Sequence, residues 1–130
     1  MDFRRIGLGM KKGINNQCDK ARKFTLKSFC ECKGICIQMK DTVADFSHCH
    51  CSQCRRIHGS AFVTFAGLPK SDFRISSGRH LLKSYESSRT YRRFFCNVCG
   101  SKLFLEVLSE PDQIYMAMHF LQLENIIFLI

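Results

Sequence analysis

The sequence predicts an all-β, or mostly β, fold in one small domain. Twelve of the 130 residues are Phe and three are Tyr, but long stretches with the 3.6-residue period of a helix are few. Several short runs alternate between apolar and polar residues instead, and turn-forming residues separate them. Nine Cys also give this small chain the means to bind metal ions that supplement a modest core.

The expected strands follow one another with short connections. The first begins at Phe24, and in the second Ile35, Ile37 and Met39 alternate with more polar residues, which is typical of a half-buried strand. A β-branched and aromatic run at 61–66 comes next, and Gly67-Leu68-Pro69 predicts a turn after it. Further strands are expected at 90–95, 103–107 and 114–118, and one short helix at 52–58.

The two ends of the chain differ in composition from the middle. Residues 1–24 hold seven Lys or Arg and two Asp, which predicts a basic flexible leader. Residues 119–130 form an apolar tail with one charge, Glu124, for which we expect a self-association contact such as a homodimer. The domain itself is expected at 25–118. The net charge of +9 favours anionic partners without identifying one.

The cysteine usage predicts bound metal in a reducing compartment. We expect no secretory leader, because the N-terminus has no apolar run of signal-peptide length. No run is long enough to span a membrane, so we expect a cytoplasmic protein without a membrane partner. Thiols stay reduced in the cytoplasm, and clustered Cys there more often bind metal than form disulfides.

Seven of the nine Cys fall into three clusters, and their number sets the metal sites. Seven thiolates fill one closed zinc site of four sulfurs and one site of three with an open position. The turn of Cys96 and Cys99, with Gly100 after it, can aim two sulfurs at one ion. Cys30 and Cys32 lie on one side of an extended segment and can complete that site. We therefore expect a structural zinc bound by four cysteines, Cys30, Cys32, Cys96 and Cys99.

The remaining cluster, Cys49, Cys51 and Cys54, predicts a second zinc with an open fourth position, which is the pattern of catalytic zinc. Three thiolates on Zn²⁺ leave a net charge of −1, so nearby cations are expected. Three candidates follow directly and are also candidates for substrate binding: Arg55, Arg56 and His58. The alternative is a second structural zinc whose fourth ligand is one of three histidines: His48, His50 or His58.

These clusters, in this order, resemble the GFA/CENP-V family, which contains the glutathione-dependent formaldehyde-activating enzymes. The similarity rests on Cys30-Glu31-Cys32, on Cys49-His50-Cys51-Ser52-Gln53-Cys54-Arg55-Arg56 and on Phe95-Cys96-Asn97-Val98-Cys99-Gly100-Ser101. Lys33 departs from the family, which usually has Gly directly after the second Cys. The apolar tail also differs, so we expect the C-terminus to be atypical or truncated relative to the family.

The resemblance implies a β-tent fold of small antiparallel sheets around two zinc ions, with the ligand sets named above. It also implies a carbon–sulfur lyase, which joins formaldehyde and a thiol such as glutathione to S-hydroxymethylglutathione or cleaves the product, with Cys49, Cys51 and Cys54 at the catalytic zinc. The alternative function is a non-catalytic zinc module that binds nucleic acid. Its basic surface would combine the basic leader with four residues around the last cysteine pair: Arg89, Arg92, Arg93 and Lys102.

Overall fold

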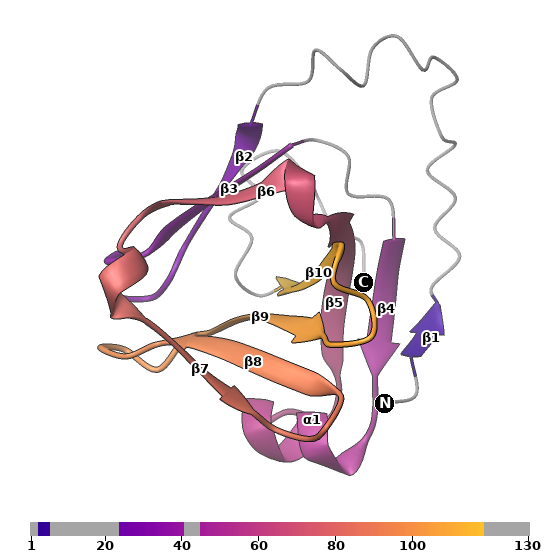
Figure 1. The fold of residues 1–130 in the computed structure, drawn as a ribbon. Coiled ribbons are helices and arrows are strands. Elements are labelled where there is room, and N and C mark those ends of the chain that lie inside the picture. Colours follow the sequence, from indigo (N-terminus) through magenta and orange to yellow (C-terminus); the bar gives the residue numbers. More distant parts are fainter. Residues whose placement is uncertain (1–2, 6–23, 41–44, 119–130) are drawn as a thin grey trace, which may run out of the picture.

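The structure is a computed structural model that describes residues 3–5, 24–40 and 45–118. Its largest element is a seven-stranded antiparallel sheet with the order β1-β4-β5-β10-β9-β8-β7 (Figure 1). The strands of this sheet are β1 (Phe3–Arg5), β4 (Asp45–Cys49), β5 (Val63–Pro69), β7 (Leu82–Glu86), β8 (Tyr91–Cys96), β9 (Lys102–Val107) and β10 (Gln113–Ala117).

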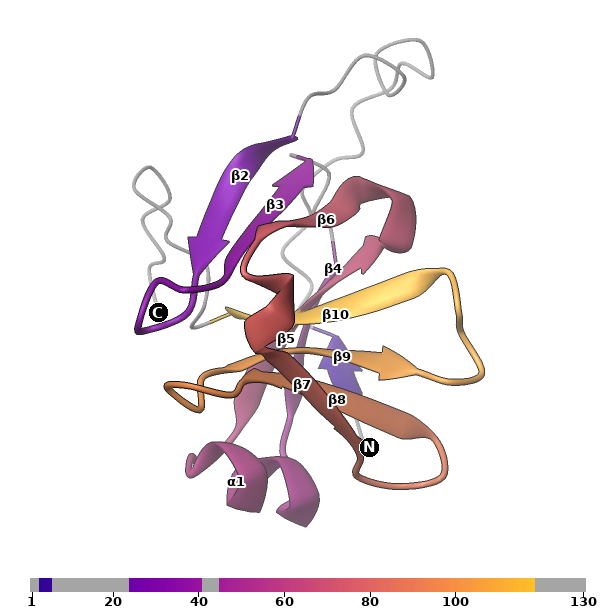
Figure 2. The same ribbon diagram turned by 60° about the vertical axis from the view of Figure 1, so that its left-hand side comes forward.

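A second, smaller antiparallel sheet has the order β2-β3-β6. Its strands are β2 (Phe24–Phe29), β3 (Cys36–Lys40) and β6 (Phe73–Ser77). One α-helix, α1 (Ser52–His58), and two 3₁₀ turns, η2 (Lys70–Asp72) and η3 (Arg79–Leu81), complete the described elements. The small sheet and α1 lie at opposite ends of the molecule in both views (Figures 1 and 2).

The two faces of the large sheet have different neighbours. Cross-strand register places Phe94, Phe104 and Met116 on one face. They belong to a core that includes Ile37 and Met39 of the small sheet, so this core lies between the two sheets. Leu105 is on the opposite face and belongs to a second core that includes two cysteines of the cluster at α1. The fold therefore gives each predicted metal cluster its own apolar core.

The mostly β fold expected from the sequence is confirmed. The short helix lies where the sequence predicted it, at 52–58. The turn expected at Gly67-Leu68-Pro69 is wrong, because β5 continues to Pro69 and pairs with β10 up to Gln113. Residues 3–5, expected within a flexible leader, form β1 against β4. The expected apolar tail, 119–130, lies outside the described residues.

No helix in the described part of the chain combines the length and the apolar character that crossing a membrane requires.

Candidate metal centres

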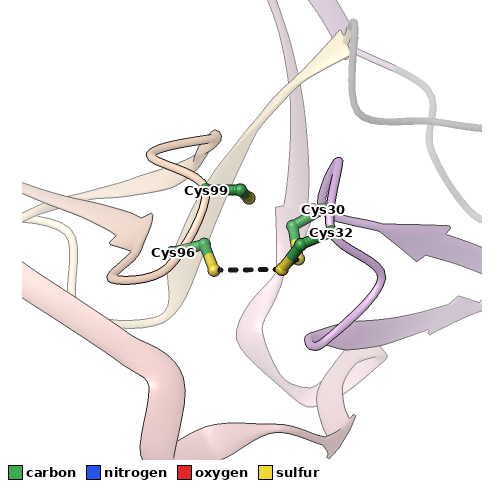
Figure 3. A group of neighbouring side chains, drawn as sticks. All are labelled: Cys30, Cys32, Cys96 and Cys99. Carbon is green, nitrogen blue, oxygen red and sulfur yellow. Dashed lines mark hydrogen bonds between the residues drawn. The ribbon is translucent and has the colours of Figure 1, made fainter.

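Two separate segments bring four cysteines to one end of the fold. Cys30 and Cys32 lie in the turn between β2 and β3, while Cys96 ends β8 and Cys99 lies in the turn before β9. Figure 3 shows the four side chains facing one another across the gap between these turns. Cys30 and Cys96 are buried, whereas Cys32 is exposed. We call this group the four-cysteine cluster.

The sulfur positions in the four-cysteine cluster fit a tetrahedral zinc ion. Zinc–thiolate bonds of about 2.3 Å in a tetrahedron place neighbouring sulfurs about 3.8 Å apart. Sγ of Cys32 lies 3.8 Å from Sγ of Cys96 and 3.5 Å from Sγ of Cys30. All four sulfurs lie within 4.8 Å of one another. The donor set and its spacing are therefore those of a closed zinc site.

Close backbone packing holds the turn between β2 and β3 against the segment that follows β6. A Cβ on Gly78, whose φ is +79°, would lie 1.9 Å from the carbonyl oxygen of Gly34, so only glycine fits at this contact. Ser101 links this turn to the Cys96–Cys99 turn, because its Oγ accepts from the amide of Glu31 at 3.0 Å and lies 3.1 Å from Sγ of Cys99. Lys33 adopts a φ of +61°, a conformation that non-glycine residues rarely take.

The thiols of this cluster have divergent pKa values. Burial raises the pKa of Cys99, but the Ser101 hydroxyl and the Cys32 amide outweigh this effect and lower it to about 6. The Gly34 amide lowers the pKa of Cys32, whereas the Cys30 thiol, burial and the thiols of Cys99 and Cys96 raise it to about 12. The protons are thus shared unevenly among adjacent sulfurs, and a divalent metal would displace those that remain.

The other three cysteines meet at the start of α1. Cys49 ends β4, Cys51 is the N-cap residue of α1, and Cys54 lies inside the helix. Sγ of Cys51 accepts a hydrogen bond from the Cys54 amide at 3.3 Å and lies 3.4 Å from Sγ of Cys49. Their three sulfurs lie within 4.8 Å of one another, which also fits zinc. We call this group the three-cysteine cluster.

The three-cysteine cluster is buried on one side and more open on the other. Cys49 and Cys54 are fully buried, whereas Cys51 is half-buried. No His, Asp or Glu among residues 3–5, 24–40 and 45–118 joins the three sulfurs as a fourth ligand. The described part of the chain therefore offers three ligands, and the fourth ligand of a zinc ion at this cluster would come from elsewhere.

Burial and mutual contact also perturb the thiols of the three-cysteine cluster. Burial raises the pKa of Cys49 to about 12, with smaller contributions from the thiols of Cys54 and Cys51. Burial alone would raise the pKa of Cys51, but hydrogen bonds from the Cys54 amide and neighbouring groups lower it. The pKa of Tyr91 is raised, first by burial and then by the nearby cysteine charges. Cys51 thus ionises more readily than Cys49.

A buried arginine lies against this cluster. Arg93 of β8 is only 4% exposed, and its Nη2 donates to Sγ of Cys54 at 3.4 Å. A guanidinium so close to a thiolate offsets part of the negative charge that three thiolates leave on a divalent metal. The basic surface expected from the sequence includes Arg93, but the burial of Arg93 removes it from any such surface. The sequence does contain a signal for this burial, because Arg93 lies between Tyr91 and Phe95 in the alternating pattern of β8.

The cations predicted from the sequence lie on α1 with different surroundings. Arg55 and Arg56 are exposed on the helix. His58 is half-buried, packs edge-on against Phe65 with ring centroids 5.8 Å apart, and lines a small pocket beside the cluster. His58 is thus the candidate among the three that the fold turns toward the pocket.

The other two histidines are positioned by an exposed aromatic side chain. Nδ1 of His48 lies 2.8 Å from Oγ1 of Thr64, and its ring packs edge-on against Phe62. His50 stacks on the same Phe62 ring. Neither is part of the group of sulfurs that can hold a metal.

Comparisons with known proteins identify the family. Residues 25–126 match the family model described as "Glutathione-dependent formaldehyde-activating enzyme", GFA for short. This chain belongs to the GFA family. The match covers the whole predicted domain, both cysteine clusters and the first part of the apolar tail.

Related proteins agree with this membership. A Podospora anserina protein named "Putative glutathione-dependent formaldehyde-activating enzyme" is 26% identical over 98 residues, which are 75% of this chain and 46% of the relative. An "Uncharacterized lyase" of Schizosaccharomyces pombe is 31% identical over 100 residues, which are 76% of this chain and 71% of that protein. The chain spans about half the length of the first curated relatives it matches.

A solved structure shares the GFA fold seen here. The crystal structure of a Rhodobacter sphaeroides protein matches with a TM-score of 0.64 and 28% sequence identity. The match covers 78% of this chain and 91% of that one.

Proposed function

We propose that this protein joins formaldehyde and a small thiol such as glutathione to S-hydroxymethylglutathione, or cleaves that product, at the three-cysteine cluster. The observation that carries the proposal is the contrast between the two clusters. One has four sulfurs spaced for a closed site, whereas the other has three sulfurs and a half-buried face at Cys51. A closed site serves structure, while an open position serves chemistry.

The residues of the chain supply binding and charge for this reaction. Zinc, when bound by Cys49, Cys51 and Cys54, would supply the Lewis acidity that keeps a substrate thiol ionised at neutral pH. Arg93 offsets the negative charge of the cluster from its buried side. Exposed Arg55 and Arg56 on α1 offer cations for the carboxylates of a thiol such as glutathione.

Support for the thiol and the aldehyde comes from the family. The GFA family model and the Podospora relative both carry glutathione and formaldehyde in their names, and the Schizosaccharomyces relative is named a lyase. The chain spans about half the length of the first curated relatives, so the substrates in their names are part of the proposal for this chain.

The test is the exchange of formaldehyde between its free and glutathione-bound forms. The uncatalysed addition is already fast, so exchange NMR with ¹³C-formaldehyde at equilibrium is the suitable assay. We expect the zinc-loaded full chain to raise the exchange rate in proportion to protein concentration. Cys51→Ser should abolish the increase, while Cys36→Ser, which removes a thiol outside both clusters, should keep it. An exchange rate that the wild-type protein leaves at its background value would contradict the proposal.

The alternative of a nucleic-acid-binding module has less support from the basic residues that suggested it. Arg93 is buried, and Arg92 is paired with Glu86 at 2.9 Å. Lys102 lies over the ring of Phe95. Binding of a labelled oligonucleotide that weakens steeply with salt would favour the alternative.

A further inference from the structure

Arg93, which contacts the three-cysteine cluster, has one nitrogen without a hydrogen-bond partner among the described residues. Of the charged side chains in the described residues, that of Arg93 is the buried one. Its Nη1 is buried and has no hydrogen-bond partner in the described part of the chain. A buried guanidinium N–H group needs an acceptor, so an oxygen atom from outside these residues is expected there.

The rest of the guanidinium is held in place by two elements. Nε donates to Oγ of Ser87 at 2.8 Å, and Nη2 donates to Oε1 of Gln53 at 3.3 Å as well as to Sγ of Cys54. The Gln53 amide in turn donates to the Ser87 carbonyl at 2.9 Å, which links α1 to the β7–β8 turn. Arg93 is therefore fixed relative to the cluster, with Nη1 as its free donor.

The surroundings favour a small ligand. Arg93 lines a small pocket, and none of the residues around it is Asp or Glu. Apolar side chains make up most of its wall: Ile57, Phe65, Phe104, Leu105 and Ala117. A buried donor beside the Cys54 sulfur suits an oxygen atom close to the reacting atoms.

We propose that Arg93 is a catalytic residue of the three-cysteine cluster whose Nη1 donates to the aldehyde oxygen. The inference rests on the proposed function. In that reaction the thiolate sulfur gives an electron pair to the aldehyde carbon, a C–S bond forms, and the π pair of the carbonyl moves onto oxygen. The alkoxide, stabilised by Nη1, then takes a proton from water to give the hydroxymethyl product and hydroxide.

An equilibrium test uses the cobalt-loaded full chain. Thiolate-to-cobalt absorption changes when a fourth sulfur binds at the three-cysteine cluster, while the four-cysteine cluster gives a constant background. The probes are thioglycolate, which places an oxyanion next to its sulfur, and 2-mercaptoethanol, which places a neutral hydroxyl there. We expect wild-type protein to prefer thioglycolate at least about tenfold, as a charge-assisted hydrogen bond implies.

Three variants distinguish hydrogen-bond donation by Nη1 from the effect of the positive charge of Arg93. Arg93→Met should reduce the preference to within about twofold. Arg93→Lys keeps the charge but not the planar fork, so it should reduce the preference below about threefold. Arg92→Met is the matched control, because Arg92 is the neighbour on the opposite face of β8, with 40% of its side chain exposed, and it should keep the full preference.

A kinetic experiment tests the same contact with the aldehyde itself. In the formaldehyde exchange assay at saturating glutathione, Arg93→Met should lower the catalysed rate by about 100-fold, which is typical for loss of an oxyanion donor. The glutathione concentration for half-saturation should change less than threefold, because Nη1 contacts the aldehyde and not the thiol.

The results of these experiments distinguish failure of the proposed function from failure of the inference about Arg93. If neither thiol binds cobalt-loaded wild-type protein, the proposed function fails and this inference fails with it. If thiols bind but Arg93→Met retains the preference or the rate, this inference alone fails. If Arg93→Lys retains the full preference, a bare charge suffices and donation from Nη1 is wrong. If both variants lose cobalt or unfold, Arg93 is a structural residue and the inference is overturned.

Discussion

Replacing one cysteine in each cluster should destabilise the protein by different amounts, because the clusters join different lengths of chain. Cys32 and Cys96 are 64 residues apart, so metal in the four-cysteine cluster closes a long loop and joins the small sheet to the large one. The chain-entropy model for cross-links gives about 4 kcal/mol for a loop of 64 residues. Cys49 and Cys54 are five residues apart, and the same model gives about 2 kcal/mol for that loop.

The perturbation is therefore Cys96→Ser against Cys51→Ser, with Cys36→Ala as the control. Cys36 is 8% exposed in β3 and lies outside both clusters, so its loss should cost under about 1 kcal/mol. Domains of this size have unfolding free energies of about 5–15 kcal/mol, so a loss of about 4 kcal/mol removes much of the stability of Cys96→Ser and should lower its urea midpoint strongly. Cys51→Ser should remain folded with a lower urea midpoint.

The assay is urea denaturation of the zinc-saturated full chain, followed by far-UV circular dichroism because the chain has no Trp. Equal losses of unfolding free energy in the two Ser variants would refute the reasoning. So would a Cys96→Ser protein that unfolds cooperatively at the wild-type midpoint.

Three further predictions concern the backbone near the four-cysteine cluster and the tail. Gly78→Ala should lower the unfolding free energy by about 3 kcal/mol, because its Cβ would lie 1.9 Å from the Gly34 carbonyl oxygen; a urea midpoint equal to wild type would contradict this close approach. Lys33→Gly should raise the unfolding free energy by about 1 kcal/mol, because Lys33 has a φ of +61°; a loss of stability would show that the Lys side chain matters more than the backbone. Light scattering should give a dimer mass for the full chain and a monomer mass after deletion of 120–130, and a monomeric full chain at high micromolar concentration would disprove association through the tail.

The sequence predicted elements whose pattern is local and missed those that depend on pairing. The alternation in β8 and the apolar runs of β9 and β10 were visible, because these strands face a core. β4 and β7 were missed, since Asp45–Cys49 and Leu82–Glu86 are short and mostly polar. Pro69 signalled a turn, yet it ends β5, where a missing N–H costs little.

The same distinction holds for the candidate sites. Ligand counting in the sequence grouped the cysteines as the structure now brings them together, because four sulfurs close a zinc site and three leave it open. The contact of Arg93 with Cys54 joins residues 39 positions apart, and nothing local predicts it. Gly78 is similar, since its role depends on the Gly34 carbonyl of another turn.

The central claim is that one cluster binds metal with four cysteines and the other with three and an exchangeable ligand. Metal analysis of the full chain, combined with cobalt absorption spectra before and after addition of glutathione, tests it most directly. We predict two metal ions per chain, and a spectrum that gains one thiolate ligand per chain when glutathione is added. One ion per chain, or two ions with a spectrum that glutathione leaves unchanged, would contradict the account.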